Sequence, residues 1–281
     1  MLTLKKYMEL RLHTVYPARE RQALLRIVAE DVCRVPFHKL LIEDDASLPP
    51  EVLERAVGVI DRLSEGEPIQ YILGYTEFRG MKLRVAPGVL IPRPETSALV
   101  DWVLEDFPAF DDNVLDIGTG SGCIALTLRS SRNGGVVWAA DISPSALEIA
   151  RRNGEENALD VRWVQTDILG EGCWENLPSN LRCIVSNPPY VMEKEQSEMA
   201  QNVLRYEPPE ALFVPDDNPL LFYRAIARFG KKHLSPQGKI YVEINEKCGE
   251  SALAMFKKEG YRQISLRKDL FGKDRMIKAE I

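Results

Sequence analysis

Val114-Leu115-Asp116-Ile117-Gly118-Thr119-Gly120-Ser121-Gly122 is an apolar run that ends in a glycine-rich turn. The run predicts a short strand, and the residues after it, at about 122–130, have the apolar spacing of a helix. Glycine lets the backbone turn tightly and approach a ligand closely. A strand, a glycine-rich turn and a helix in this order indicate an α/β domain that binds a ligand at the turn.

Strand and helix signals alternate from residue 95 to the end of the chain. Strands are expected at 113–117, 136–140, 161–165, 182–186, 239–244, 264–267 and 276–281, and helices at about 95–106, 122–130, 144–157, 218–233 and 248–258. This order predicts a mostly parallel seven-stranded sheet with helices on both faces. No helix separates the last two strands, so we expect them to form an antiparallel hairpin. Residues 95–281 are therefore interpreted as one α/β domain.

Residues 1–74 are expected to form a small helical-bundle domain. Apolar residues recur at helical spacing between Ala23 and Val28 and between Val52 and Ile60. Prolines stand at the breaks of this pattern, where helices start or stop. Two interpretations are open for this domain: a structural cap, or a module that docks a partner.

Residues 75–94 are interpreted as a hairpin and a linker. Short alternating runs lie on either side of Gly80, as in a hairpin. In Leu90-Ile91-Pro92-Arg93-Pro94 the two prolines fix an extended backbone. The linker is either a rigid spacer or a segment that brings Arg93 and Glu95 to the mouth of the active site.

Composition excludes several classes of function. The net charge of −6 does not suggest an electrostatic DNA-binding protein, which usually needs a basic patch. Five cysteines without a CxxC pair and three scattered histidines give no metal-ligand spacing, so no metal is expected. Such cysteines fit a reducing cytoplasm. Charged residues interrupt the apolar N-terminus, so we expect neither a signal peptide nor a membrane span.

The glycine-rich turn is followed by acids at the ends of the next two predicted strands. Gly118, Gly120 and Gly122 give the pattern G-x-G-x-G, and the dinucleotide fingerprint G-x-G-x-x-G is not met. Asp141 ends the second strand, where a carboxylate can accept both ribose hydroxyl protons, and Asp167 ends the third, near an adenine amino group. No phosphate-binding lysine is present. The pattern favours S-adenosylmethionine as cofactor over the alternative, a plain α/β turn with solvated acids.

Asn187-Pro188-Pro189-Tyr190 follows a fourth apolar strand, at 183–186. The Asn187 amide offers an acceptor, the Pro188 carbonyl offers a second one, and the Tyr190 ring offers a flat face. Together they suit a planar NH2 group, which carboxamides and adenine both carry. Our hypothesis is that the two acceptors take the two protons of that group and orient its nitrogen toward the methyl donor. The alternative is an ordinary strand-ending turn.

The chain resembles the HemK/PrmC family of release factor glutamine N5-methyltransferases. The resemblance is carried by stretches along most of the catalytic domain and its linker, which are Glu67–Gly74, Glu77-Phe78, Leu90–Thr96, Asp116–Gly122, Ser186–Tyr190 and Tyr206-Glu207-Pro208. Ile-Pro-Arg-Pro-Glu-Thr together with Asn-Pro-Pro-Tyr is specific to this family. Asn-Pro-Pro-Tyr alone is not, because DNA adenine methyltransferases share it.

The resemblance implies a class I, Rossmann-like methyltransferase fold with S-adenosylmethionine bound at the glycine turn. By position, the cofactor residues would be Gly118, Thr119, Gly120, Ser121, Gly122, Asp141, Asp167, Ile168 and Asn187. Asn187, Pro188 and Tyr190 would act in catalysis, and these three with Pro189 would hold the substrate. Ile168 stands where relatives often have an aromatic residue, so adenine would pack against an aliphatic side chain. Ser97 stands where an acid is common.

The implied substrate is the glutamine of the Gly-Gly-Gln motif in peptide-chain release factors. Release factors are therefore the expected partner, with no nucleic acid and with the enzyme as a monomer. The competing hypothesis is an N6-adenine methyltransferase that flips a base onto Tyr190. A third is a non-enzymatic adaptor, against which the intact glycine turn and acceptor loop argue.

Overall fold

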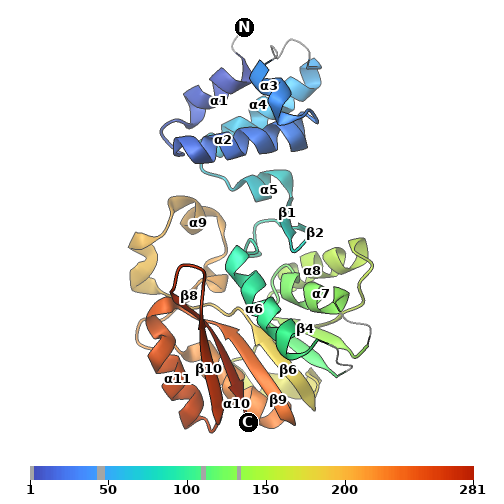
Figure 1. Ribbon diagram of the computed structural model, residues 1–281, viewed down its shortest axis with the longest axis vertical. Helices are drawn as coiled ribbons and strands as arrows, with labels where there is room; N and C mark the ends of the chain where they lie inside the picture. The colour runs from blue at the N-terminus through green and yellow to red at the C-terminus, as the bar shows by residue number, and fades with distance from the viewer. Residues whose placement is uncertain (1–2, 43–47, 109–111, 132–133) are drawn as a thin grey trace. The chain divides into compact units, whose positions relative to one another are not determined.

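The apolar run before the glycine turn forms β3 (Val114–Ile117), whose side chains are all buried. In the computed structural model, which describes residues 3–42, 48–108, 112–131 and 134–281, β3 lies inside a seven-stranded sheet (Figure 1). Its neighbours β4 (Val137–Asp141) and β6 (Leu181–Ser186) are parallel to it. A strand between parallel neighbours, with both faces covered by helices, has no solvent-exposed side, which explains its apolar sequence.

The sheet has the strand order β10-β11-β9-β6-β3-β4-β5. Its remaining strands are β5 (Arg162–Gln165), β9 (Leu234–Glu243), β10 (Gln263–Lys268) and β11 (Asp274–Glu280). β11 is antiparallel to both β10 and β9, and the other neighbours are parallel. The predicted mostly parallel sheet and its C-terminal hairpin are therefore confirmed.

β9 starts at Leu234, five residues before the start of the strand expected at 239–244. This first part pairs with β6 only irregularly, with a register shift between Leu181 and Cys183. Pro236 lies in the same part. Since proline has no N–H for the ladder, it occurs in sheets at edges and irregularities, which accounts for the shift.

Helices cover both faces of the sheet. On one face, α6 (Pro94–Asp106) and α7 (Cys123–Ser130) form a buried cluster with β6 and β9, and α8 (Pro144–Glu156) packs beside α7. On the other face lie α10 (Leu221–His233) and α11 (Gly249–Lys258). The alternation of strands and helices predicted for residues 95–281 thus produces the three layers of an α/β domain.

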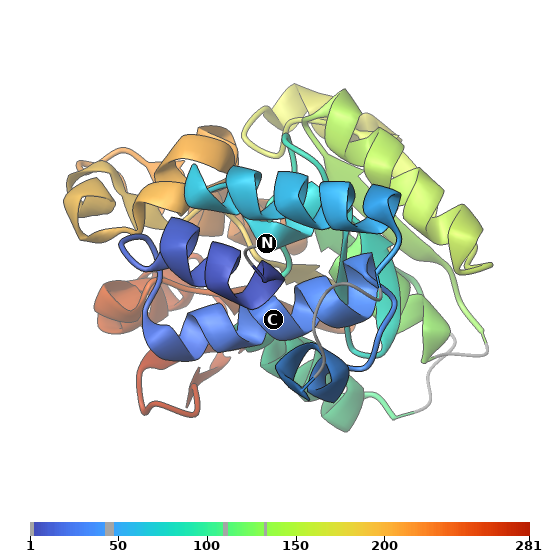
Figure 2. The ribbon, with the colours of Figure 1, turned by 90° about the horizontal axis from the view of Figure 1, so that it is seen from above.

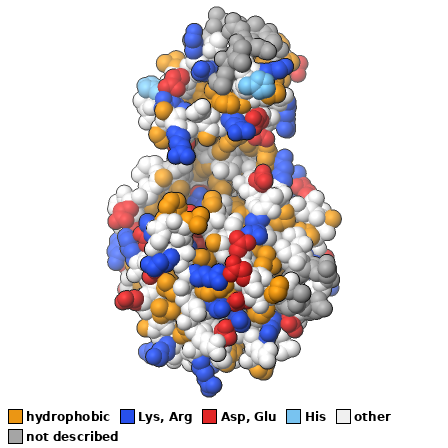
Figure 3. Space-filling view, viewed as in Figure 1, with side chains coloured by type: hydrophobic (Ala, Val, Ile, Leu, Met, Phe, Trp, Pro, Cys, Tyr) orange, Lys and Arg blue, Asp and Glu red, His pale blue; other side chains and the backbone are white. Residues whose placement is uncertain are grey.

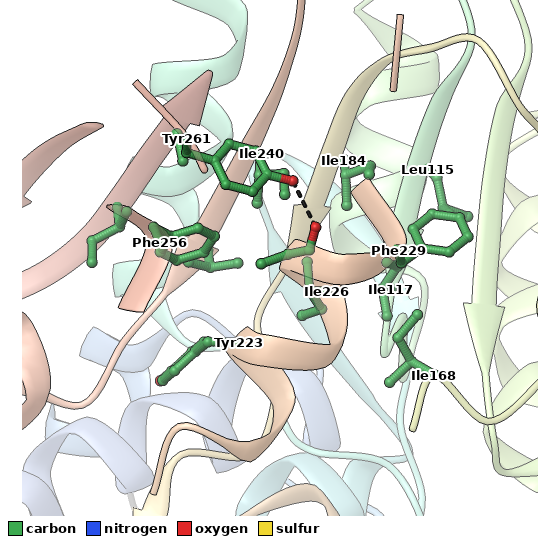
Figure 4. Packing of buried hydrophobic residues seen from close by; sticks show 14 of the residues in the cluster. Leu115, Ile117, Ile168, Ile184, Tyr223, Ile226, Phe229, Ile240, Phe256 and Tyr261 are labelled. Atoms are coloured by element: carbon green, nitrogen blue, oxygen red, sulfur yellow. Dashed lines mark hydrogen bonds between the residues drawn. The ribbon is translucent and has the colours of Figure 1, made fainter. Parts of the chain in front are cut away.

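The cluster beneath α10 connects the sheet to the predicted cofactor site. Figure 4 shows Ile117 of β3 and Ile184 of β6 facing Ile226 of α10, with Ile168 beside them. The Tyr261 hydroxyl donates a hydrogen bond of 2.8 Å to the Ala227 carbonyl, which satisfies that hydroxyl inside the cluster. Ile168 is therefore held by the core as well as placed next to the site.

Several short elements connect the sheet and its helices. β1 (Tyr75–Phe78) and β2 (Met81–Arg84) form the hairpin expected around Gly80. The others are β7 (Val191–Met192), β8 (Phe213–Val214), η3 (Glu171–Asn176), η4 (Glu193–Glu198), η5 (Pro209–Ala211) and η6 (Glu246–Cys248). Among the helices in the described ranges, none combines the length and the apolar character that crossing a membrane would require.

The chain folds into two compact units. The larger unit, Tyr75–Met199 with Glu207–Ile281, contains the seven-stranded sheet. The smaller unit is helical and joins Met1–Gly74 to Ala200–Tyr206, a segment that the sequence boundaries place in the catalytic domain. Arg205 Nη1 and the Tyr206 hydroxyl both donate to the Glu65 carbonyl, at 3.1 and 3.2 Å, which ties this distant segment to the helices.

The smaller unit consists of the helices α1 (Leu4–Leu12), α2 (Ala18–Ile27) with the short π-helix η1 (Val28–Val32), α3 (Phe37–Ile42), α4 (Pro50–Ser64), α5 (Ile69–Leu73) and α9 (Gln201–Tyr206). The apolar spacing predicts α2 and α4, whereas α9 lies outside the predicted bundle. Figure 2 shows α1 between α2 and α4, and buried residues such as Leu12 and Ile60 fill the space between them. Prolines precede or begin α2, α3, α4 and α5, as the breaks predicted.

Candidate functional site

A cavity lies at the carboxyl ends of β3, β4, β5 and β6, entirely within the larger unit. Residues singled out by sequence line much of its wall, namely Gly118, Thr119, Gly120, Ser121, Asp141, Asp167, Ile168, Asn187, Pro188 and Pro189. Gly122 and Tyr190 are absent from the lining within the described residues. The predicted cofactor turn and the predicted acceptor loop therefore face one shared space.

The three glycines of the turn have different tasks. All have positive φ, at +71° for Gly118, +55° for Gly120 and +83° for Gly122, where other residues are strained. A Cβ on Gly118 or Gly120 would have no atom within 4 Å, so the turn leaves open space beside a ligand. A Cβ on Gly122 would lie 3.2 Å from Leu126 and Trp163. Gly122 therefore serves helix packing, which explains its absence from the cavity wall.

Asp141 connects the glycine turn to the next strand. Its Oδ2 accepts the backbone N–H of Gly120 at 2.8 Å, and its Oδ1 accepts that of Ser143 at 2.9 Å. Burial raises the pKa of this carboxyl, and the backbone N–H donors oppose that rise. Each oxygen can still accept a second hydrogen bond, as two ribose hydroxyls would need.

Asp116 lies two residues before the glycine turn, and it belongs neither to the sequence-based set of site residues nor to the described cavity lining. It is fully buried, and its Oδ2 accepts from the Thr119 hydroxyl at 2.6 Å and from the Ala125 N–H at 3.2 Å. Its Oδ1 has no hydrogen-bond partner in the structure. Burial raises the pKa of Asp116 to about 7. A lone acid in an otherwise apolar strand was the sequence signal that could have identified it.

Asp167 and Ile168 provide the polar and the apolar parts of the wall beyond β5. Asp167 Oδ1 accepts the Leu169 N–H at 2.8 Å, which fixes the loop. Ile168 is 8% exposed, and Trp174 Nε1 donates to its carbonyl at 3.1 Å. Ile168 therefore gives the cavity wall an apolar side chain that the core holds in place.

These features together fit a nucleoside joined to a cationic amino acid. The glycine turn is open, Asp141 has capacity for hydroxyl donors, and Asp116 keeps one unpartnered carboxylate oxygen. Within the part of the chain that the structure describes, no group of three His, Cys, Asp or Glu is arranged to bind a metal ion. The residues present thus suit S-adenosylmethionine.

The acceptor loop is held at each end. The Ser186 hydroxyl donates to the Ile117 carbonyl at 2.6 Å, which joins the ends of β6 and β3. The Tyr190 carbonyl accepts from Asn245 Nδ2 at 3.0 Å, and its hydroxyl donates to Glu243 Oε1 at 3.0 Å. Burial raises the pKa of Tyr190 far above its ordinary value, so its hydroxyl remains a donor. Stacking by Tyr190 on a substrate stays a prediction, since its ring lies outside the described lining.

Arg93 and Glu95 of the linker differ in their placement. Arg93 lines the cavity, whereas Glu95 does not appear in the described lining. Arg93 Nη2 donates to Glu207 Oε1 at 2.6 Å, and the Ile91 N–H donates to Glu207 Oε2 at 3.2 Å. Glu207 is buried at 3% exposure, and its two carboxylate oxygens hold Arg93 and Ile91 in place. Sequence reasoning named Glu207 only as part of a matching stretch and gave it no role, because it lies 114 residues away from Arg93.

Comparison with known proteins gives a consistent result for both parts of the chain. Residues 4–74 match the PrmC N-terminal domain, and residues 95–212 match the Methyltransferase small domain. The chain is 44% identical to the release factor glutamine methyltransferase of Bacteroides thetaiotaomicron over 273 residues, which are 97% of each chain. It is 38% identical to that of Flavobacterium psychrophilum over 271 residues, 95% of this chain and 94% of the relative.

Solved structures show the same fold at low sequence identity. A 16S rRNA N2 G1207 methyltransferase of T. thermophilus, solved with AdoMet and guanosine, superposes with a TM-score of 0.53. It is 17% identical, and the match covers 73% of this chain and 49% of that one. At this identity the likeness concerns the fold alone.

Proposed function

The chain belongs to the release factor glutamine methyltransferase family, and on that premise we propose its reaction. It transfers a methyl group to the side-chain amide nitrogen (N5) of the glutamine in the Gly-Gly-Gln motif of peptide-chain release factors. The observation that carries this proposal is the shared cavity. Gly118 and Asp141 on one side, and Asn187 and Pro188 on the other, line the same space.

S-adenosylmethionine is the cofactor of this methyltransferase. It supplies an electrophilic methyl group bonded to a sulfonium. Asp141 would hold the ribose hydroxyls, Ile168 and Asp167 would hold the adenine, and Asp116 would neutralise the amino group of the methionine part. Each assignment uses a capacity that the structure leaves open, as described above.

The acceptor is a poor nucleophile that the loop must orient. An amide nitrogen shares its lone pair with its carbonyl, so the protein has to favour the geometry in which that pair faces the methyl group. Asn187 Oδ1 and the Pro188 carbonyl would accept the two amide protons and stabilise the positive charge that develops on nitrogen. Positioning of this kind can contribute on the order of 7–11 kcal/mol. The proton leaves after transfer, so no strong base is needed before it.

The partner and the setting follow from the same reasoning. We propose that the helical unit, residues 1–74, docks the release factor and that residues 95–281 catalyse. On the face that Figure 3 shows, Lys and Arg side chains of the larger unit are interspersed with Asp and Glu, which supports a protein substrate over a phosphate backbone. A monomer acting in the cytoplasm is part of this proposal.

The test compares two acceptors side by side. Purified release factor and duplex DNA are each incubated with methyl-labelled S-adenosylmethionine, and the release factor is then digested and analysed by mass spectrometry. One added methyl on the glutamine of the Gly-Gly-Gln peptide is expected, with DNA unlabelled. A Gln→Asn substrate should fail because its amide is one methylene too short. Labelled DNA with an unmodified peptide would replace this function with adenine methylation.

A further inference from the structure

A buried hydrogen-bond chain runs behind the acceptor loop. Asn187 Nδ2 donates to Thr96 Oγ1 at 3.1 Å, and Thr96 Oγ1 donates to Glu243 Oε2 at 2.9 Å. The Tyr190 hydroxyl donates to the other carboxylate oxygen of Glu243 at 3.0 Å. Thr96 is 2% exposed and Glu243 is 1% exposed, so water does not compete for these bonds.

The members of this chain come from three separate elements. Thr96 is in the first turn of α6, Glu243 is the last residue of β9, and Asn187 follows β6. β6 and β9 are parallel neighbours with Ser186 opposite Val242, so the residues after these two are brought to the same edge. The arrangement is therefore set by the sheet register and by the packing of α6.

The protons available in this chain dictate which way the Asn187 amide points. A carboxylate has no proton to donate, so the single hydroxyl proton of Thr96 goes to Glu243. The Thr96 oxygen can then only accept, and Asn187 must turn its NH2 toward it. The opposite orientation would place Asn187 Oδ1 against Thr96 Oγ1 with no proton between the two oxygens. Asn187 Oδ1 is thereby left for the cavity, which Asn187 lines.

The hydrogen bonds to Glu243 favour its carboxylate form, while burial opposes that form. The pKa of this carboxyl is raised, because burial and the Glu95 charge outweigh the hydrogen bonds from Thr96 and Tyr190 and the positive charge of Arg275, which lower it. Both carboxylate oxygens already accept an O–H donor. The geometry is that of a carboxylate between two hydroxyl donors.

We propose that Thr96 and Glu243 are positioning residues that hold the Asn187 amide with its oxygen toward the acceptor nitrogen. The inference rests on the function proposed above, in which that oxygen accepts a proton of the substrate NH2. Thr96 belongs to the cavity lining, whereas Glu243 is not among the described lining residues. They act by excluding the flipped orientation of the Asn187 amide, in which its NH2 would face the NH2 of the substrate.

The decisive variants change the Thr96 hydroxyl alone. Thr96→Val is nearly isosteric and removes the hydroxyl, and Thr96→Ser keeps it. Thr127→Val is the matched control, because Thr127 is equally buried and its hydroxyl bonds only to the Cys123 carbonyl of its own helix, at 2.7 Å. We expect Thr96→Val to lower kcat at least about tenfold, the effect of one lost hydrogen bond. The Kd of S-adenosylhomocysteine should not change, and Thr96→Ser should restore turnover.

A second measurement reads the amide directly and needs no substrate. In 15N-labelled protein, the side-chain NH2 signals of Asn187 are assigned by their loss in Asn187→Ala. Thr96→Val should shift these signals and speed their exchange with water, whereas Thr127→Val should leave both unchanged. In the activity assay, Glu243→Gln should lower turnover by less than Thr96→Val does. The glutamine amide can either accept a proton from the Thr96 hydroxyl or donate one to it, so both orientations of the Asn187 amide become possible.

The outcomes separate this inference from the proposed function. Turnover and amide signals of Thr96→Val that equal those of Thr127→Val would overturn the positioning role while leaving the function intact. Full turnover in Glu243→Gln would remove Glu243 from the proposal. If the wild type methylates DNA and not the release factor, the function fails, and the variant series is run on DNA. If it methylates neither, the amide signals alone decide the orientation.

Discussion

Gly120 donates its backbone N–H to Asp141 Oδ2 at 2.8 Å, so the glycine turn after β3 and the carboxylate at the end of β4 hold each other in place. The two residues lie 21 positions apart and meet because β3 and β4 are adjacent parallel strands. This contact fixes two residues of the cavity lining relative to each other. A change at Asp141 should therefore affect both the turn and the ligand.

Asp141→Ala should weaken the binding of S-adenosylmethionine. Each hydrogen bond to a charged group that is lost costs about 1.5–3 kcal/mol, or roughly tenfold or more in Kd. Calorimetry with S-adenosylhomocysteine measures the change, and Asp160→Ala is a control at an exposed acid of the same unit. Equal Kd values for the two variants would remove Asp141 from the site.

Asn187→Ala should lower turnover much more than cofactor affinity, because the hydrogen bond from Asn187 Oδ1 strengthens as the methyl group moves. Loss of one preorganised contact of this kind typically lowers the rate by about 10²–10³. Single-turnover kinetics on a release factor report the chemical step. A reduction smaller than about threefold, well below that range, would show that Asn187 does not hold the acceptor.

Cofactor binding should depend on pH through Asp116. Burial raises the pKa of Asp116 to about 7, despite the hydrogen bonds from Thr119 and Ala125, so the free protein carries a neutral acid below that pH. A neutral acid attracts an ammonium group poorly. The Kd of S-adenosylhomocysteine should thus rise as pH falls through 7, by at most about tenfold per pH unit. Asp116→Asn should bind weakly with a flat profile, and a flat profile in the wild type would contradict this role.

Gly122→Ala should destabilise the protein by crowding helix α7. Its new Cβ would lie 3.2 Å from Leu126 and Trp163, and overpacking of this kind costs about 1–3 kcal/mol. Gly272→Ala is a matched control, because Gly272 has a similar φ of +79° and an added Cβ there meets no atom within 4 Å. Denaturant unfolding of both variants separates crowding from backbone strain. If both variants lost the same free energy of unfolding, the whole effect would come from the strain of a residue with a Cβ at positive φ.

Deleting residues 1–74 should raise the KM for whole release factor and spare the KM for a short Gly-Gly-Gln peptide. The reason is that a docking module contacts parts of the substrate that the peptide lacks. Binding of S-adenosylhomocysteine shows whether the truncated protein is folded. Identical KM values for release factor in both forms would reduce the helical unit to a structural cap.

The sequence by itself determined the residues that depend on local pattern. Apolar runs and glycines placed β3 and its turn, and Asp141, Asp167 and Asn187 could be assigned to one site from their positions after strands alone. That assignment works because the carboxyl ends of parallel strands meet at one edge of a sheet. The helical spacing of residues 1–74 was equally readable.

Only the tertiary structure decided which distant side chains support that site. Thr96 and Asn187 are 91 residues apart, Thr96 and Glu243 are 147 apart, and Arg93 meets Glu207 across 114. No periodicity links such positions, because their contact depends on sheet register and helix packing. The structure also turned the Tyr190 hydroxyl toward Glu243 and placed residues 200–206 with the helices of the smaller unit. Burial then set the pKa shifts of Asp116 and Glu243, since the cost of removing a charge from water exists only in the folded chain.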